Sequence, residues 1–262
     1  MDGTEAMTSF CNLTGKRGLV LGIANEHSIA AAVTRALHSR GAALVATCLN
    51  EKAVPYASAV TASLGVRLKT CNVSEEGQLE LVIREATEEL GGLDFVVHSI
   101  AWAPLEDLHG RVIDSSREGF EKAITISCHS FAELGRLAMT HMPAGGSLIT
   151  MTYHGAREVV QNYGVMGPIK AALESLVRYM AAECGQSGIR VHAISPGPIP
   201  TRAASALQSF DQLMADAAKR SPLGRLVSLE EIANLTTFLC SDESSGMTGQ
   251  TIYVDAGFNI VA

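Results

Sequence analysis

Tyr163 and Lys170 are the two residues of this sequence whose types and spacing best suit catalysis. Seven positions separate them, which is close to two helical turns, so on a helix their side chains would leave the same face. A phenol has a pKa near ~10 and donates a proton poorly at neutral pH, unless a neighbouring cation lowers that value. Lys170 is a candidate for that cation. Such a pair also occurs by chance in helices, so the surrounding elements must decide what it does.

Short apolar runs alternate with amphipathic stretches along nearly the whole chain. The predicted strands cover residues 17–21, 42–49, 66–71, 93–99, 147–152, 189–194 and 251–254. The predicted helices cover residues 29–40, 75–90 and 118–142, the segment that carries Tyr163 and Lys170, and two later segments. Strands that are apolar on both faces and separated by helices are typical of a covered parallel sheet. We therefore predict an α/β fold, a Rossmann-like doubly wound parallel sheet of about seven strands with helices on both faces.

The bulk composition fits one globular domain. The chain has 262 residues, of which 47% are hydrophobic and 18% charged, which suits a well-buried core. No linker rich in Pro, Gly or Ser divides it, so we predict a single domain over residues 13–262, preceded by a flexible extension over residues 1–12.

Charge and cysteine usage exclude several classes of function. Lys and Arg number 20 against 27 acids, without a dense basic stripe, which disfavours nucleic acid as a partner. No apolar run is long enough to predict a membrane span. The six cysteines are scattered singly and no export signal precedes them, which is typical of reduced thiols in a cytoplasmic protein. The histidines show no metal-ligand spacing, so we predict no metal site, and lone cases such as His98 are expected in the core.

Several strand ends carry residues that suit a nucleotide. Gly22 follows the first strand and Ser28 precedes the helix, at the place of a phosphate-binding turn. Only one glycine of the G-x-G-x-x-G pattern is present, so a plain strand-to-helix turn is the alternative. Asn72 follows the third strand, where its side-chain oxygen could accept from an adenine amino group. After the second strand, Glu51 would repel a 2′-phosphate, which favours NADH, while Lys52 keeps NADPH possible.

These residues together resemble the short-chain dehydrogenase/reductase superfamily, and within it the enoyl-acyl-carrier-protein reductases of fatty-acid synthesis. The resemblance rests on Gly22-x5-Ser28-Ile29-Ala30, His98-Ser-Ile-Ala-Trp-Ala-Pro104, Tyr153-x9-Tyr163-x6-Lys170, Gly197-Pro-Ile-Pro-Thr-Arg-Ala-Ala-Ser205 and Val254-Asp-Ala-Gly-Phe. Most of the superfamily places three residues between its Tyr and Lys. Six intervening residues, with a second Tyr ten positions upstream, are typical of the enoyl reductase branch.

The resemblance implies a role for each matching position. Tyr163 would hydrogen-bond the thioester oxygen as an enolate forms, Lys170 would hold the nicotinamide ribose, and Tyr153 would help to position the substrate or relay a proton. The implied cofactor-binding residues are Gly22, Ser28, Ile29, Leu49, Asn72, Val73, Ile100, Lys170, Ile199, Thr201 and Ala203. The implied substrate-binding residues are Ala103, Tyr163, Leu207 and Phe210, the last two within a substrate loop near residues 201–225.

Four positions depart from the family pattern and concern mainly the cofactor. Leu49 replaces a Gln, Asn72 an Asp, Ala101 a Gly, and Pro200 a basic residue. None of them touches the Tyr/Tyr/Lys set. Pro168, between Tyr163 and Lys170, is expected to set a helix start or a kink.

The partners that the resemblance implies are an acyl-carrier protein and further copies of the chain. Basic residues exceed acidic ones by two near the predicted loop, and acyl-carrier proteins are acidic, so we predict docking there by charge complementarity. The basic residues of this patch are Arg202, Lys219, Arg220 and Arg225. Family members are commonly homotetramers, and the apolar C-terminal segment is a candidate for a subunit contact.

Two alternative functions stay open. A 3-ketoacyl or carbonyl reductase of the same superfamily would need a Ser hydroxyl beside its Tyr, and here Thr152 and Tyr153 close the fifth strand instead. A non-catalytic dinucleotide-binding relative is the other alternative, since a fold does not fix a function.

Overall fold

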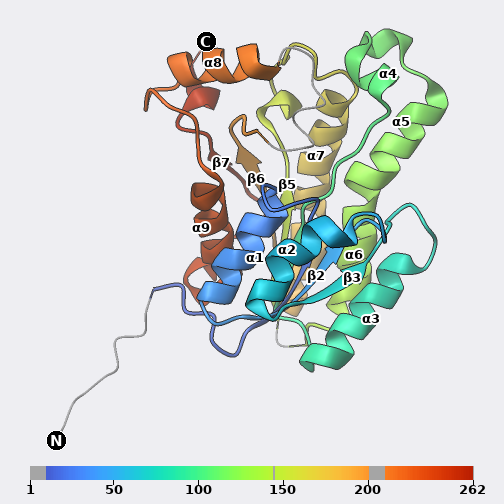
Figure 1. The fold of residues 1–262 in the computed structure, drawn as a ribbon, viewed down its shortest axis with the longest axis vertical. Coiled ribbons are helices and arrows are strands. Elements are labelled where there is room, and N and C mark those ends of the chain that lie inside the picture. The colour runs from blue at the N-terminus through green and yellow to red at the C-terminus, as the bar shows by residue number, and fades with distance from the viewer. Residues whose placement is uncertain (1–9, 144, 201–209, 262) are drawn as a thin grey trace, which may run out of the picture.

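The protein is a layered α/β structure built on one parallel sheet (Figure 1). The computed structural model describes residues 10–143, 145–200 and 210–261. The strands are β1 (Arg17–Leu21), β2 (Ala43–Cys48), β3 (Arg67–Thr70), β4 (Phe95–His98), β5 (Gly146–Met151), β6 (Ile189–Pro196) and β7 (Thr251–Val254). They form a seven-stranded sheet in the order β3-β2-β1-β4-β5-β6-β7, with every neighbouring pair parallel. The predicted fold class is confirmed.

The order of the strands reverses direction between β1 and β4. The chain winds from β1 outward to β3, then returns to β4 beside β1 and winds outward to β7. In parallel sheets a crevice opens at such a switch point, beyond the carboxyl ends of the strands. The strand order therefore predicts a ligand site beside the ends of β1 and β4.

Helices cover both faces of the sheet. They are α1 (Ile29–Ser39), α2 (Val54–Leu64), α3 (Gln78–Leu90), α4 (Leu105–His109), α5 (Arg117–Ile124), α6 (Ser130–Met139), α7 (Met166–Cys184), α8 (Phe210–Arg220) and α9 (Leu229–Cys240). One hydrophobic cluster joins the sheet to α1, α2 and α9, and a second joins it to α3, α5, α6 and α7. Burial on both faces explains why strands such as β4 are apolar at successive positions.

The helix α2 is absent from the sequence-based prediction. Its sequence, VPYASAVTASL, consists mainly of small and β-branched residues, and only Ala57, Val60 and Thr61 are buried. Such a segment lacks the broad apolar stripe by which an amphipathic helix is recognised. Its ends carry the usual signals, a Pro in the first turn and Gly65 in the left-handed conformation at the C-terminus.

The long helix predicted over residues 118–142 is interrupted. Between α5 and α6, residues Thr125–His129 form a π-helical turn, η2. Such turns occur mostly as single insertions within α-helices, often at functional sites. Here the hydroxyl group of Ser130 donates to the carbonyl oxygen of Ile126 at 2.7 Å, inside the altered turn.

The packed part of the chain begins before residue 13. Cys11 is buried, and its N–H donates to Glu243 Oε1 at 2.7 Å. Leu13 is fully buried. Within the described ranges, no helix has the length and apolar character needed to cross a membrane.

Candidate active site

The three predicted catalytic residues come from the segment after β5, the turn before α7 and the first turns of α7 itself. Tyr153 lies two residues after β5, and the short helix η3 (His154–Ala156) follows it directly. The rings of Tyr153 and Tyr163 meet edge to face, with centroids 4.9 Å apart and an angle of 61° between their planes. The structure thus brings together two phenols that are ten positions apart in the sequence.

Tyr163 lies outside the helix on which the sequence analysis placed it. The helix α7 begins at Met166, whose N–H donates to the Tyr163 carbonyl oxygen at 3.1 Å. Gly164, in between, has a φ of +47°, and any Cβ there would clash with the Leu108 carbonyl oxygen. The prediction that Tyr163 and Lys170 lie two turns apart on one helix is therefore wrong, because only Lys170 is helical.

Pro168 lies in the first turn of α7, where a backbone N–H has no partner within the helix. It therefore marks a helix start.

Lys170 is buried at the base of the site. Only 4% of the residue is exposed, and its Nζ donates to the Met151 carbonyl oxygen at 2.7 Å. Burial lowers the pKa of its ammonium group to about 8, against an ordinary value of 10.5. A buried cation of this kind is costly for a fold and marks a candidate functional site.

The phenols behave differently from the sequence-based expectation. Desolvation raises the pKa of Tyr163 well above its ordinary value, and the neighbouring Tyr153 raises it further. Burial also raises the pKa of Tyr153, to about 12. Lys170 does not acidify Tyr163 in this structure, which corrects the expectation. Both hydroxyl groups instead keep their protons at neutral pH, and so both can donate hydrogen bonds.

The hydroxyl group of Tyr153 is buried and has no hydrogen-bond partner among the described residues. A buried polar atom without a partner costs roughly 1–3 kcal/mol, so such an atom in a native protein needs an explanation. A ligand oxygen placed beside the two phenols would supply the missing partner.

Proteins similar to this chain are found among the enoyl-(acyl-carrier-protein) reductases. The family model described as Enoyl-(Acyl carrier protein) reductase matches residues 22–259. The chain belongs to this family. Enoyl-(acyl-carrier-protein) reductase (NADH) 2 of Rhizobium meliloti is 41% identical over 254 residues, which cover 95% of this chain and 94% of that protein. The enoyl-(acyl-carrier-protein) reductase (NADH) of Aquifex aeolicus is 40% identical over 251 residues, covering 95% and 93% of the two chains.

Solved structures of the family are similar over nearly the whole length. The Bacillus cereus enoyl-acyl carrier protein reductase with NADP+ and indole naphthyridinone has a TM-score of 0.93, 38% identity, and coverage of 96% of this chain and 99% of that one. The reductase of Anaplasma phagocytophilum in complex with NAD has a TM-score of 0.92, 37% identity and 98% coverage of both chains. The family resemblance drawn from the motifs is confirmed.

The segment predicted to be a phosphate-binding turn runs from the end of β1 to the start of α1. Gly22 has a φ of +102°, and any Cβ there would clash with the Ser99 carbonyl oxygen, so β1 and β4 end in close contact. Ser28 accepts from the Ala31 N–H at 3.3 Å and caps α1. Ile29 is the first residue of α1, at the end of the helix that attracts anions. A glycine cradle beside a helix N-terminus fits a dinucleotide.

The other predicted cofactor residues that the structure describes also lie at the carboxyl edge of the sheet. Leu49 follows β2, Val73 lies near the end of β3, Ile100 follows β4, and Ile199 follows β6. Leu49 is 54% exposed, and Ile199 is buried. The substrate residue predicted beyond β4, Ala103, is half-buried. Thr201, Ala203 and Leu207 lie outside the described residues; Phe210 begins α8, and its side chain also lies outside.

Asn72 is held differently from the expectation. Its side-chain oxygen accepts from the N–H of Ser74 at 3.1 Å and from the hydroxyl group of Ser74 at 2.8 Å. Both lone pairs of an amide oxygen are thereby used. The oxygen expected to accept from an adenine amino group is therefore engaged in the local turn in this structure, and the adenine contact stays a prediction.

Two buried polar networks around Lys170 escaped the sequence analysis. His98 is fully buried and contacts Thr150 Oγ1 at 3.1 Å and Ser130 Oγ at 2.9 Å, and its pKa is lowered to about 3 by desolvation. Since Ser130 donates to a carbonyl oxygen, it accepts from His98 Nε2–H, and Nδ1 accepts from Thr150. The second network joins Glu174 to Thr152 and Arg157. The residues of each network are far apart in the sequence. The i,i+4 spacing of Lys170 and Glu174 is the one local signal that could have indicated the second network.

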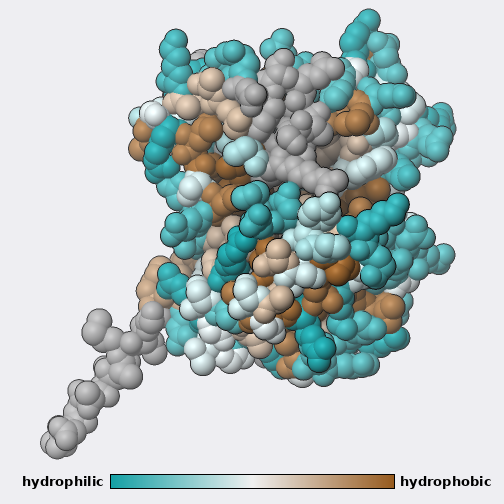
Figure 2. Space-filling view, in the orientation of Figure 1, coloured by the Kyte–Doolittle hydropathy of each residue, from teal (hydrophilic) through white to brown (hydrophobic). Residues whose placement is uncertain are grey.

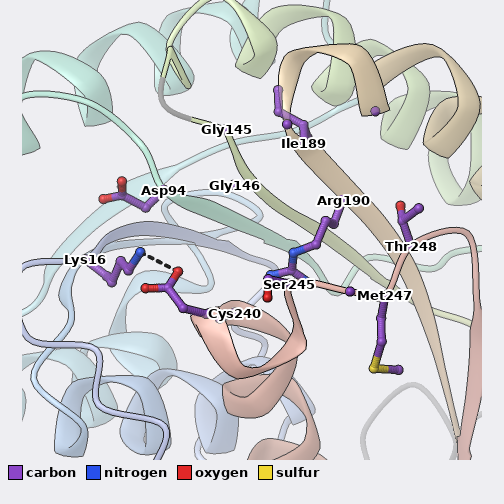
Figure 3. A pocket seen from close by; sticks show the side chains of 14 residues that line it. Lys16, Asp94, Gly145, Gly146, Ile189, Arg190, Cys240, Ser245, Met247 and Thr248 are labelled. Carbon is purple, nitrogen blue, oxygen red and sulfur yellow. Dashed lines mark hydrogen bonds and ion pairs between the residues drawn. The ribbon is translucent and has the colours of Figure 1, made fainter. Parts of the chain in front are cut away.

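A separate cavity opens at the opposite edge of the sheet (Figure 3). Lys16 pairs there with Asp242 at 2.8 Å, while Arg190 NH2 donates to the carbonyl oxygens of Leu239 and Ser241 and so caps the end of α9. Because ligands of parallel sheets bind beyond the carboxyl ends, this cavity lies away from the candidate active site. Among the residues that the structure describes, no cluster of three or more His, Cys, Asp or Glu could hold a metal ion.

Proposed function

We propose that this protein reduces the carbon–carbon double bond of a trans-2-enoyl thioester carried on acyl-carrier protein, with NADH as the reductant, in fatty-acid biosynthesis. The observation that carries the proposal is the edge-to-face Tyr153–Tyr163 pair after β5, where buried Lys170 donates to the last residue of that strand, Met151, in a member of the enoyl reductase family. Bound NADH supplies the hydride for the β-carbon of the substrate. Gly22, Ser28 and Lys170 are the proposed contacts of the cofactor.

Negative charge develops on the thioester oxygen during the reduction, and the protein must stabilise it there. Tyr163 donates a hydrogen bond to this oxygen, and its raised pKa keeps the proton on the phenol until the enolate has formed. A donor aimed at the atom where charge develops stabilises the transition state more than the ground state. The hydroxyl group of Tyr153 is buried and has no hydrogen-bond partner among the described residues. We propose that it donates a hydrogen bond to the same thioester oxygen and so positions the substrate.

The carbonyl-reducing alternative is disfavoured by the position of Thr152. A 3-ketoacyl reductase needs a free hydroxyl group beside its Tyr, but the Thr152 hydroxyl group is buried and donates to Glu174 Oε1 at 3.1 Å.

We expect the purified protein to oxidise NADH with crotonyl thioester and to leave acetoacetyl thioester unchanged. The loss of the nicotinamide absorbance measures both reactions. Turnover of acetoacetyl thioester alone would support the alternative, and turnover of neither would support a non-catalytic relative.

The proposed docking surface for acyl-carrier protein is smaller than the sequence suggested. Lys219 and Arg220 are exposed in the last turn of α8. Arg225, by contrast, forms a two-pronged ion pair with Glu231, at 2.7 and 2.9 Å, so its charge is already matched. Arg202 lies outside the described residues.

Reversing the charges of Lys219 and Arg220 to Glu should raise KM for an enoyl-acyl-carrier protein about tenfold and leave KM for crotonyl-CoA unchanged, because only the protein substrate is acidic over a large surface. Steady-state kinetics with both substrates measures this. Arg225→Glu is the matched control and should affect thermal stability more than KM. Equal changes with both substrates would rule the surface out.

A homotetramer in the cytoplasm is the proposed state of the protein. All four residues of β7, at the edge of the sheet, remain half-exposed, and Leu223 and Ile260 are 64% and 75% exposed. Figure 2 shows hydrophobic residues gathered beside α8 and α9, on an otherwise largely hydrophilic face. Such a patch on an edge strand supports a contact between subunits. The six buried, unpaired cysteines support a reducing compartment.

A further inference from the structure

The carboxylate of Glu174 is buried one helical turn beyond Lys170. Both residues are 4% exposed, and both reach the end of β5, where Lys170 donates to the Met151 carbonyl oxygen and Glu174 accepts from Thr152. Residues four apart on a helix are neighbours, with Cβ atoms about 5–6 Å apart. A buried cation and a buried anion in this arrangement stabilise each other's charge.

Glu174 also holds the strand end and the turn that carry Tyr153. Its Oε1 accepts from Thr152 Oγ1 at 3.1 Å, and its Oε2 accepts from Arg157 Nε at 3.1 Å. Thr152 directly precedes Tyr153, and Arg157 ends the short helix η3 that follows it. The carboxylate therefore contacts the chain on both sides of Tyr153.

We infer that Glu174 is a positioning residue: its carboxylate keeps the buried Lys170 ammonium charged and ties the turn that carries Tyr153 to α7. The inference rests on the proposed function, in which Lys170 holds the cofactor. Arg157 weakens the stabilisation of the Lys170 charge by Glu174, because it forms an ion pair with the same carboxylate at 3.1 Å. The Arg157 side chain is 56% exposed, so this second cation lies on the solvent side of Glu174.

The other groups that face Lys170 cannot replace Glu174 near neutral pH. His98 on β4 is neutral because burial lowers its pKa to about 3, and Cys128 on η2 is a thiol whose pKa burial raises. Tyr153 and Tyr163 also keep their protons, since their pKa values are raised. On β5, Met151 offers only its carbonyl oxygen. Cys128 and Glu174 are the described neighbours that raise the pKa of Lys170 against the effect of burial, and of the two only Glu174 is a carboxylate.

The test is the pH dependence of NADH binding, measured by fluorescence titration between pH 6.5 and 9.5 without acyl substrate. The affinity of the wild-type protein should fall with a midpoint near pH 8, as Lys170 loses its proton. Glu174→Gln should lower this midpoint by about one unit, so that affinity at pH 8 drops about fivefold. Arg157→Gln should raise the midpoint by about half a unit, because it removes a competing cation. Thr152→Val, which changes no charge, should leave the midpoint unchanged.

Opposite shifts in the two charge variants support the inference, since a merely structural defect would weaken binding at every pH without moving the midpoint. Identical midpoints in all four proteins would overturn it, as would a flat wild-type curve, which would also remove Lys170 from cofactor binding. Should Glu174→Gln fail to fold, Arg157→Gln still decides, because its exposed side chain is easily replaced. If the midpoints shift as expected but the wild-type protein does not reduce crotonyl thioester, the proposed function is refuted and the inference about Glu174 still stands.

Discussion

Replacing Tyr163 with Phe is expected to lower kcat for crotonyl thioester by ~10²–10³, the typical cost of removing one donor to a developing oxyanion. The ring of Tyr163 would still pack against Tyr153, at the 4.9 Å spacing of the wild-type pair. Only the hydroxyl group is lost, so NADH affinity and thermal stability should change little. Steady-state kinetics, NADH titration and thermal melting of the same preparation measure the three effects.

The matched control for this prediction is Tyr179→Phe. Tyr179 is 68% exposed in the second half of α7, so removal of its hydroxyl group should leave kcat unchanged. A Tyr163→Phe variant that keeps more than about a tenth of wild-type kcat would assign the donor role to another group, with Tyr153 as the first candidate.

Lys170→Met should weaken NADH binding at least tenfold at pH 7, because a charged hydrogen-bond donor to the cofactor is lost at a buried position. Lys16→Met is the control, since Lys16 pairs with Asp242 at the opposite edge of the sheet. Wild-type affinity in Lys170→Met would contradict the cofactor role of this residue.

The same variant should fold with a Tm within a few degrees of the wild-type value. The pKa of Lys170 is depressed to about 8 from 10.5, so at pH 7 its charge costs the folded state roughly 3 kcal/mol. The lost hydrogen bond to the Met151 carbonyl oxygen offsets much of this gain.

The lowered pKa of Lys170 also predicts how the free energy of unfolding depends on pH. Between pH 8 and 10, the unfolded wild-type chain binds more protons at Lys170 than the folded protein does, so this residue makes stability rise with pH. Lys170→Met should lack this contribution, so the stability of the wild-type protein minus that of the variant should increase over this range. Urea unfolding of both proteins at pH 7.5 and 9.5 measures the difference.

The sequence was sufficient to predict the sheet. It also predicted that the candidate site lies beyond the carboxyl ends of the strands. The central strands β1, β2, β4, β5 and β6 are short apolar runs buried on both faces, and this pattern is local, so a parallel sheet of about seven strands could be predicted from it. The sequence also predicted a phosphate-binding turn at Gly22 and Ser28, because a strand end, a glycine and a helix cap follow each other directly in the chain, and the strand end and the cap are confirmed.

Features that depend on contacts between distant segments could not be predicted. The start of α7 after Tyr163 depends on Gly164 lying against Leu108, 56 positions away, and the π turn η2 gives no periodic signal of its own. The pKa values of the phenols are set by burial, which the sequence alone does not fix. A neighbouring lysine in the sequence therefore suggested an acidified phenol, whereas desolvation has the opposite effect.

The most direct test of the central claim follows isotope from NADH into the product. The protein would be incubated in ordinary water with crotonyl-acyl-carrier protein and NADH that carries two deuterium atoms at C4 of the nicotinamide. The account predicts a butyryl product with one deuterium on the β-carbon and a solvent proton on the α-carbon, as seen by mass spectrometry and NMR. A 3-hydroxyacyl product, deuterium at the α-carbon, or unchanged crotonyl thioester would contradict it.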